Sequence, residues 1–342
     1  MDPDLTPSAS LPSPERFLDF TMAYRRTAVL RAAIQLDLFT ALAEGPLDVA
    51  TIAQRINSSP RGVRILCDAL AALKVLQKDS GRYNLTMEAS VFLSRLSPAC
   101  MTDAMLFLSD PFIQSSFSNL AAAVRLGGPE QKGADVLAAE HAFWLDFGRA
   151  MAPMMSFPAE MIAQILGAAR GEPWNVLDIA AGHGMFGIAI ARHNPGATVT
   201  ALDWPAVLEI AHTNAEAAGV AARHHLKPGS AFELDFGSGY HLVLVTNFLH
   251  HFDPPTNVAL LRRVHAALVP GGRAAILEFV PNEDRLAPEF PVLFSLNMLV
   301  HTPSGDAYTF SELQRMTQSA GFQSCVPHPL TPGPQTLLVA TK

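Results

Sequence analysis

The chain has 342 residues, which is enough for two domains with sizeable hydrophobic cores. Hydrophobic residues make up 49% of it and charged residues only 16%, a composition that excludes a largely disordered chain. The 31 acidic and 24 basic residues give a formal net charge of −7, which argues against nucleic acid as the main partner.

The three cysteines, Cys67, Cys100 and Cys325, lie far apart in the sequence. They form neither a closely spaced metal-binding pair nor an even set of disulfide partners, and so predict reduced thiols. The first residues show no basic segment leading into an apolar one, and no apolar run is long enough to span a bilayer. We therefore expect a cytoplasmic protein with no membrane partner.

The first hundred residues predict a short tail followed by helices and a hairpin. Residues 1–14 are rich in Pro and Ser and are expected to be a mobile tail. Apolar residues recur at helical spacing over 17–42, and Gly45-Pro46 ends that pattern. Two shorter helices are predicted over 48–56 and 60–76, before a polar turn between short extended pieces. This order is that of a winged helix-turn-helix domain, here residues 15–100.

The winged-helix order raises the alternative of a DNA-binding regulator that senses a small molecule. Residues 45–90 carry six basic and four acidic residues, a net charge of only +2. The long apolar stripe over 17–42 is better suited to packing against another chain. We therefore favour a homodimer formed by this domain, with no nucleic acid partner.

A helical connector is predicted over residues 101–165, interrupted at Gly127-Gly128-Pro129. Its later part, residues 143–155, is dense in aromatic residues and methionine. Such density is typical of an ordinary core, but methionine is also common at adaptable binding surfaces. Both interpretations remain open from this segment alone.

The most informative segment is 175–187, where an apolar run ends and a turn of small residues precedes a helical pattern. It predicts a strand, a glycine-rich turn and a helix start, with Gly182 and Gly184 free to adopt positive φ. The run 182–187 matches G-x-G-x-x-G, which is typical of NAD or FAD sites and would make the protein an oxidoreductase. Asp178 followed by this loop instead matches the first motif of S-adenosylmethionine (SAM) methyltransferases.

Alternating strands and helices follow the glycine-rich turn. The predicted strands cover residues 198–203, 241–246, 273–279, 324–328 and 336–341. The helices between them predict a doubly wound, Rossmann-like α/β sheet that binds ligands at the carboxyl ends of its strands. Asp203 ends the second strand, where a carboxylate can accept both ribose hydroxyls of either cofactor, and Trp204 is placed to cover an adenine face.

The segment Leu268-Val269-Pro270-Gly271-Gly272 resembles the L-x-P-G-G turn of SAM methyltransferases, and a final antiparallel strand pair is typical of their fold. From Phe17 to Lys342 the chain resembles the small-molecule O-methyltransferases, which include plant caffeate and isoflavone enzymes and animal acetylserotonin O-methyltransferase. The resemblance implies a methyltransferase domain over 166–342, SAM as methyl donor, S-adenosylhomocysteine as product and a winged-helix domain that dimerises.

The resemblance also implies a set of cofactor-binding positions. The D-x-G-G-G-x-G loop of the family falls on residues 178–184, where two glycines have become alanine, and Ser230 replaces an aspartate. A family lysine falls on Thr246 and is lost. The implied cofactor-binding residues are Asp178, Ala180, Gly182, Gly184, Asp203, Trp204, Ser230, Ala231, Phe232, Thr246 and Asn247.

Leu249-His250-His251-Phe252 matches the family's L-H-D-W motif, whose histidine is the general base. A phenol with a pKa near 10 attacks poorly unless its proton is removed, and a positioned histidine contributes about 10²–10⁴-fold. The match selects His250, which is expected to be the one of the two histidines that faces the pocket. Glu278 matches the first glutamate that supports the base, whereas the second falls on Ala307, next to Asp306.

The resemblance places the acceptor wall on two further segments, both rich in methionine and aromatic residues. Its residues are Met151, Met154, Met155, Phe294, Asn297, Met298, His301 and Thr302. No carboxylate cluster suggests a metal ion. We therefore predict a SAM-dependent O-methyltransferase acting on a small aromatic hydroxyl. The alternatives are a family relative that uses SAM without methyl transfer, a NAD-linked oxidoreductase and a winged-helix regulator.

Overall fold

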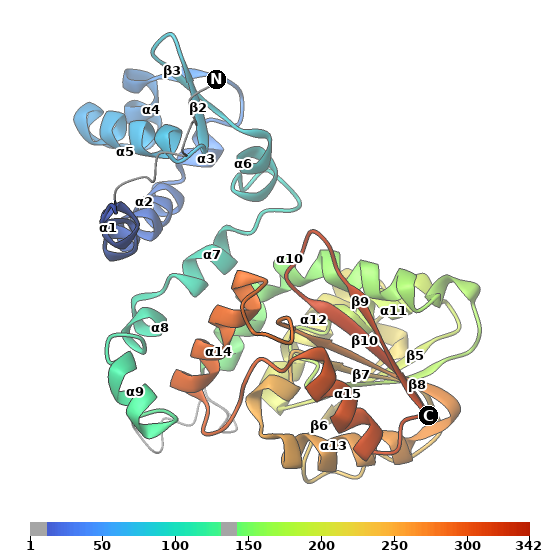
Figure 1. Cartoon of the computed structure of the whole chain (residues 1–342). Coiled ribbons are helices and arrows are strands. Elements are labelled where there is room, and N and C mark those ends of the chain that lie inside the picture. Colours follow the sequence, from blue (N-terminus) through green and yellow to red (C-terminus); the bar gives the residue numbers. More distant parts are fainter. Residues whose placement is uncertain (1–11, 131–141) are drawn as a thin grey trace, which may run out of the picture. The chain divides into compact units, whose positions relative to one another are not determined.

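The computed structural model of the chain describes residues 12–130 and 142–342 (Figure 1). Most of the predicted tail, residues 1–11, and residues 131–141 of the predicted connector lie outside the described residues. The chain divides into two compact units, Met1–Ser109 and Asp110–Lys342. Within the described residues, no helix is both long enough and apolar enough to cross a membrane.

The first unit combines helices with a small three-stranded antiparallel sheet, as the predicted winged-helix order requires. Its helices are α1 (Glu15–Met22), α2 (Tyr24–Gln35), α3 (Leu38–Ala41), α4 (Val49–Arg55), α5 (Pro60–Ala72), α6 (Met87–Phe92) and α7 (Thr102–Leu108). The strands β1 (Leu47–Asp48), β2 (Leu76–Asp79) and β3 (Arg82–Leu85) pair in the order β1-β3-β2.

Two local features of this unit bear on the sequence predictions. Ser59 caps α5, because its hydroxyl accepts a hydrogen bond from the N–H of Gly62 at 3.1 Å. The helical stripe over 17–42 is not one helix but three, since Asp37 adopts a left-handed φ of +54° that ends the second of them. None of the residues of α1 is buried in this chain.

The second unit is built around one seven-stranded sheet (Figure 1). Its strands are β4 (Asn175–Ile179), β5 (Thr198–Asp203), β6 (His224–Pro228), β7 (Tyr240–Thr246), β8 (Leu268–Glu278), β9 (Ser324–Pro329) and β10 (Thr336–Thr341). They lie in the order β6-β5-β4-β7-β8-β10-β9; the first five run parallel, and β10 pairs antiparallel with both β8 and β9. The predicted doubly wound α/β fold is confirmed.

Helices cover both faces of this sheet. On one face lie α10 (Ala142–Ile165), α11 (Met185–His193) and α12 (Pro205–Ala217); on the other lie α13 (Pro254–Ala267) and α15 (Phe310–Ser319). The shorter α8 (Pro111–Ser115) and α9 (Leu120–Leu126) precede them, and α14 (Glu289–His301) contacts α9. Thr309 and Glu312 form a capping box at the start of α15.

The strand order reverses at β4. The next two strands along the chain, β5 and β6, lie on one side of β4, and β7 then pairs with its other side. In an open parallel sheet a crevice forms at such a point, outside the carboxyl ends of the strands. The sheet beneath this crevice is fully buried, with Val176, Leu177, Val243 and Leu244 all at 0% exposure. The crevice is therefore held by a rigid apolar layer.

Candidate active site

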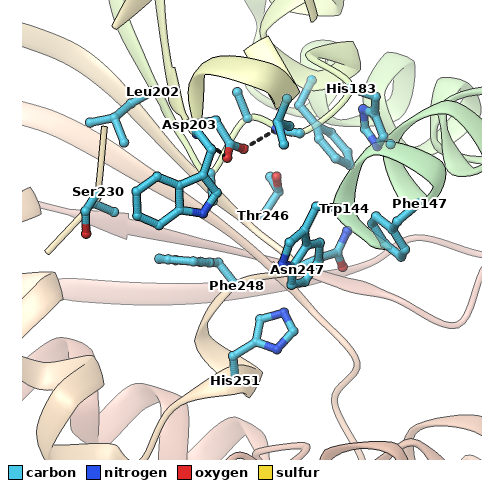
Figure 2. A pocket seen from close by; sticks show the side chains of 18 of the residues that line it. Trp144, Phe147, His183, Leu202, Asp203, Ser230, Thr246, Asn247, Phe248 and His251 are labelled. Atoms are coloured by element: carbon cyan, nitrogen blue, oxygen red, sulfur yellow. Dashed lines mark hydrogen bonds between the residues drawn. The ribbon is translucent and has the colours of Figure 1, made fainter. Parts of the chain in front are cut away.

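A cavity of about 280 Å³ lies at the carboxyl ends of β4, β5 and β7 (Figure 2). Its walls combine a loop of small residues, three acidic or hydroxyl groups and many aromatic rings. The lining residues are Trp144, Phe147, Gly148, Ala180, Ala181, Gly182, His183, Phe186, Leu202, Asp203, Trp204, Val207, Gly229, Ser230, Ala231, Phe232, Thr246, Asn247, Phe248, His251 and Phe252. A concave site with aromatic walls and few polar groups suits one flat organic ligand.

The loop after β4 brings main chain to the cavity wall. Gly182 and Gly184 adopt left-handed φ values of +56° and +74°, as their expected conformational freedom allows. Gly182 lines the cavity, whereas Gly184 does not. A Cβ at Gly184 would come within 2.9 Å of the Ala211 side chain, so this glycine lets α11 start close against α12.

Asp203, at the end of β5, ties this loop to the sheet and faces the cavity. Its Oδ2 accepts a hydrogen bond from the N–H of Gly182 at 2.8 Å, and its Oδ1 accepts one from the N–H of Trp204 at 2.7 Å (Figure 2). Burial raises the pKa of Asp203, while the two N–H groups act in the opposite direction. The carboxylate has lone pairs left for a ligand hydroxyl.

Asp178 does not reach the cavity. It is fully buried in β4, where its Oδ2 accepts a hydrogen bond from the N–H of Gly187 at 3.1 Å, within the first turn of α11. Its Oδ1 has no hydrogen-bond partner among the described residues, and burial raises the pKa of this carboxyl to about 7. The structure thus places Asp178 behind the loop, as a contact to the helix N-terminus.

An aromatic cluster closes the opposite side of the cavity. The rings of Phe232, Phe248 and Phe252 meet edge to face or tilted, with centroids 4.8 Å apart for Phe232–Phe252 and 5.0 Å for Phe248–Phe252. Ser230 lies at the same wall, and its hydroxyl accepts a hydrogen bond from the N–H of Phe232 at 3.2 Å.

The turn after β7 is organised by one carboxylate. Glu278, only 2% exposed at the end of β8, uses Oε1 to accept hydrogen bonds from the N–H groups of Phe248 at 3.1 Å and Leu249 at 2.8 Å. The N–H of His250 points at the same oxygen from 3.4 Å. Glu278 therefore fixes the backbone of the 3₁₀ turn Leu249–His251.

The other oxygen of Glu278 fixes the ring of His250. Oε2 lies 2.6 Å from Nδ1 of His250, and both side chains are buried. An ionised carboxylate can only accept, so the proton of this hydrogen bond belongs to Nδ1. In the neutral ring Nε2 then carries a free lone pair. The edge of the Phe294 ring faces this imidazole, with centroids 4.9 Å apart.

The expectation that only His250 of the two histidines faces the pocket does not hold for this cavity. His251 lines the cavity, and His250 is not among the lining residues. The reason is the buried Glu278, which draws the ring of His250 to its own side of the turn. Consecutive residues of a 3₁₀ turn point in different directions, so the ring of His251 is directed to the cavity instead.

Of the predicted acceptor wall, Met151 and Met155 are buried in α10, and Met298 and Thr302 are buried at α14. None of the eight predicted residues lines the cavity described above: Met151, Met154, Met155, Phe294, Asn297, Met298, His301 and Thr302. One of them contacts a lining residue, since the Nδ2 of Asn247 lies 3.9 Å from Sδ of Met155. Phe294 contacts His250, which does not line the cavity.

Two family descriptions match the sequence, an O-methyltransferase dimerisation domain over residues 18–95 and an O-methyltransferase domain over residues 117–323. The second covers more than half of the chain. The chain belongs to the O-methyltransferase family. Both matched domains are O-methyltransferase domains, so the comparisons do not support the alternatives of a NAD-linked oxidoreductase or a DNA-binding regulator.

Characterised relatives span nearly the whole chain. The tetracenomycin polyketide synthesis 8-O-methyltransferase TcmO of Streptomyces glaucescens is 28% identical over 99% of this chain and 99% of its own length. The acetylserotonin O-methyltransferase of Mus musculus is 29% identical over 89% of this chain and 82% of its own length.

Solved structures agree with this assignment. A Nostoc punctiforme protein assigned as an O-methyltransferase has a TM-score of 0.91 and 44% identity, over 97% of this chain and 100% of that one. Human N-acetylserotonin methyltransferase in complex with SAM has a TM-score of 0.82 and 25% identity, over 98% and 99%. PigF with S-adenosylhomocysteine has a TM-score of 0.79 and 26% identity, over 97% and 100%.

The structure accounts for two departures from the family's motifs. Ala180 stands where the family's loop has glycine, yet it keeps a left-handed φ of +52°, a conformation that costs an L-residue about 1–2 kcal/mol. Ala307, at the place of the second supporting glutamate, is buried. Its neighbour Asp306 pairs with Arg285 at 3.2 Å and accepts the N–H of Ala307. No side-chain hydrogen bond links Asp306 to His250 among the described residues, so it does not replace that glutamate.

Sequence reasoning did not single out several residues that line the cavity. Trp144 and Phe147 come from α10, far before the glycine-rich loop, and only their aromatic density pointed to them. His183 lies inside the loop, and Phe248 and Phe252 flank the histidine pair. No periodicity could have assigned these positions, because the cavity is assembled from separate segments of the chain.

Proposed function

We propose that this protein transfers the methyl group of SAM to a hydroxyl of a small aromatic acceptor and releases S-adenosylhomocysteine. The observation that carries this proposal is the buried His250–Glu278 pair, which stands beside an aromatic-walled cavity in a member of the O-methyltransferase family. Family membership supports the reaction class, and the names of the relatives support an aromatic acceptor.

The residues around the cavity fit SAM. Asp203 offers a carboxylate to the ribose hydroxyls, and the backbone of Ala180 and Gly182 leaves room for the amino acid end. Phe232 and Phe252 provide apolar ring surfaces against which the adenine ring can pack. When bound, SAM supplies an electrophilic methyl group. Human N-acetylserotonin methyltransferase with SAM and PigF with S-adenosylhomocysteine support this choice of cofactor.

His250 is proposed as the general base. Its Nδ1 is held by Glu278, so Nε2 is free to accept the hydroxyl proton of the acceptor as the oxygen attacks. Glu278 then stabilises the imidazolium that forms. Phe294, edge-on to the same ring, is proposed to belong to the acceptor wall with the other residues of α10 and α14 named above.

The direct test is methyl transfer from isotope-labelled SAM to a panel of phenols, together with calorimetric binding of S-adenosylhomocysteine and NADH. We expect transfer to at least one phenol and binding of S-adenosylhomocysteine but not NADH. Binding of NADH without S-adenosylhomocysteine would overturn the cofactor assignment. Binding of S-adenosylhomocysteine without transfer to any phenol would overturn the reaction.

Replacing Asp203 by alanine is expected to weaken S-adenosylhomocysteine binding by about 1.5–3 kcal/mol, because a charge-assisted contact to the ribose is lost. Calorimetry measures the change in Kd. Glu233→Gln is the matched control, since Glu233 is an exposed carboxylate on the adjoining segment and does not line the cavity. An Asp203→Ala protein that binds S-adenosylhomocysteine as tightly as wild type contradicts the proposed role.

The first unit is proposed to form a homodimer, with residues 15–100 as the dimerisation domain. Phe17 and Phe20 on α1 are 70% and 65% exposed in the single chain. Large apolar side chains that are exposed together mark a surface for packing against another chain, and both lie in or beside the matched dimerisation domain. Phe17→Asp with Phe20→Asp is expected to convert dimers into monomers, as analytical ultracentrifugation will show. Leu286→Asp, which changes a 79% exposed residue outside the proposed dimerisation domain, is expected to leave the dimer intact. Wild-type protein that sediments as a monomer at micromolar concentration contradicts this proposal.

A further inference from the structure

His251 is an imidazole without a hydrogen-bond partner in the described part of the chain. Its Nδ1 is buried and unpaired, and no hydrogen bond of its other ring nitrogen is found among those residues either. A buried polar atom left unpaired costs about 1–3 kcal/mol. The wall of the cavity therefore holds a ring whose hydrogen-bonding capacity is unused by the residues that the structure describes.

The surroundings of His251 place it on the acceptor side of that cavity. Its ring stands edge-on to Trp144 at 5.8 Å and Phe248 at 6.5 Å (Figure 2). The ring of His250 lies 4.3 Å away, centroid to centroid. His301, of the predicted acceptor wall, is close enough to lower the pKa of His251 together with burial and His250. His251 thus lies between the proposed base and the acceptor helices.

The chemistry of this ring differs from that of the family residue it replaces. Burial is the largest cause that lowers the pKa of His251 well below its ordinary value, so the imidazole is neutral. A neutral imidazole offers one donor and one acceptor, whereas an aspartate at this position would offer acceptors only and a negative charge. A ring of this kind can pair with a hydroxyl or with a carbonyl oxygen.

We propose that His251 hydrogen-bonds a second oxygen of the acceptor, next to the hydroxyl that is methylated. Two imidazoles whose centroids are 4.3 Å apart are best matched to two acceptor oxygens that lie close together. They can reach oxygens on neighbouring ring carbons or across the shared edge of fused rings. The favoured acceptors are therefore aromatics with an ortho or peri pair of oxygens, such as catechols and hydroxy-carbonyl compounds. This inference rests on the proposed function.

The test compares kcat/KM for catechol, resorcinol, hydroquinone and phenol in wild type and in His251→Phe. Wild type is expected to favour catechol by about 10- to 100-fold, because a lone hydroxyl leaves His251 unpaired. In His251→Phe, which keeps a flat ring without nitrogen, the ratio of catechol to resorcinol should fall to near one. His251→Gln, which restores a donor and an acceptor, should recover part of the ratio.

The control is His225→Phe, because His225 is exposed on β6 and does not line the cavity. Its ratio of catechol to resorcinol should equal that of wild type. A catechol preference that survives in His251→Phe, or a wild type with no preference, overturns the inference and leaves the proposed function standing. If wild type methylates none of the four compounds although it binds S-adenosylhomocysteine, the proposed function fails and the inference with it.

Discussion

Replacing His250 by glutamine is expected to lower kcat by about 10²–10⁴-fold, with the affinity for S-adenosylhomocysteine nearly unchanged. Glutamine keeps a polar side chain of similar length, but its amide cannot accept the acceptor's proton as an imidazole can. The cofactor affinity should be preserved because His250 does not line the cavity that Asp203 and Gly182 help to form. Single-turnover methyl transfer from labelled SAM measures the first quantity and calorimetry the second.

His225→Gln serves as the control for loss of a histidine, since this exposed residue of β6 stands away from the turn. The two variants should unfold at similar temperatures if the loss in His250→Gln is chemical. If His250→Gln turns over an accepted phenol as fast as wild type, the base assignment is wrong. Proximity and exclusion of water, acting on an acceptor already ionised in solution, would then have to account for the rate.

Much of the fold follows from the sequence because strands and helices alternate with strong local signals. The strands Thr198–Asp203 and Thr336–Thr341 have the predicted bounds. Strand β6, His224–Pro228, was not predicted, because its histidines, lysine and proline show no apolar alternation and only pairing with β5 makes it extended. Likewise α2 ends because Asp37 adopts a left-handed conformation, and the apolar pattern over 17–42 does not predict a helix end at this position.

Site residues at the ends of strands could be predicted from the sequence. Site residues whose orientation depends on contacts between distant segments could not. Asp203 and Glu278 end parallel strands, so topology brings them to one edge of the sheet. The direction of the His251 ring depends on the buried Glu278, which holds the turn from 28 positions away. Asp178 matches a motif, yet its side chain is used by the N–H of Gly187 behind the loop. Sequence spacing contains none of this information.

Glu278→Gln is expected to abolish most of the methyl-transfer activity, because it changes which ring nitrogen of His250 carries the proton. In wild type one carboxylate oxygen accepts the N–H groups of Phe248 and Leu249, and the other accepts Nδ1–H of His250. An amide has only one oxygen, and the two N–H groups of the turn require it. The NH₂ group must then face Nδ1, which becomes an acceptor, so the ring proton moves to Nε2.

With its proton on Nε2, His250 can no longer accept the proton of the acceptor's hydroxyl. In serine proteases, changing the aspartate beside the catalytic histidine to asparagine produces the same wrong tautomer and costs about 10⁴-fold in kcat. We expect a loss of about 10²–10⁴-fold here, as large as that of His250→Gln. Imidazole ¹⁵N chemical shifts distinguish the mechanism, since they should show Nδ1–H in wild type and Nε2–H in Glu278→Gln.

Glu160→Gln is the matched control, because Glu160 also pairs with a histidine, His193, but this pair is only partly buried and does not line the cavity. This variant should keep wild-type kcat. A Glu278→Gln protein with the wild-type tautomer but low activity would show that charge on Glu278, rather than ring orientation, supports the reaction. A Glu278→Gln protein with kcat within threefold of wild type would remove Glu278, and the pairing that defines this site, from the mechanism.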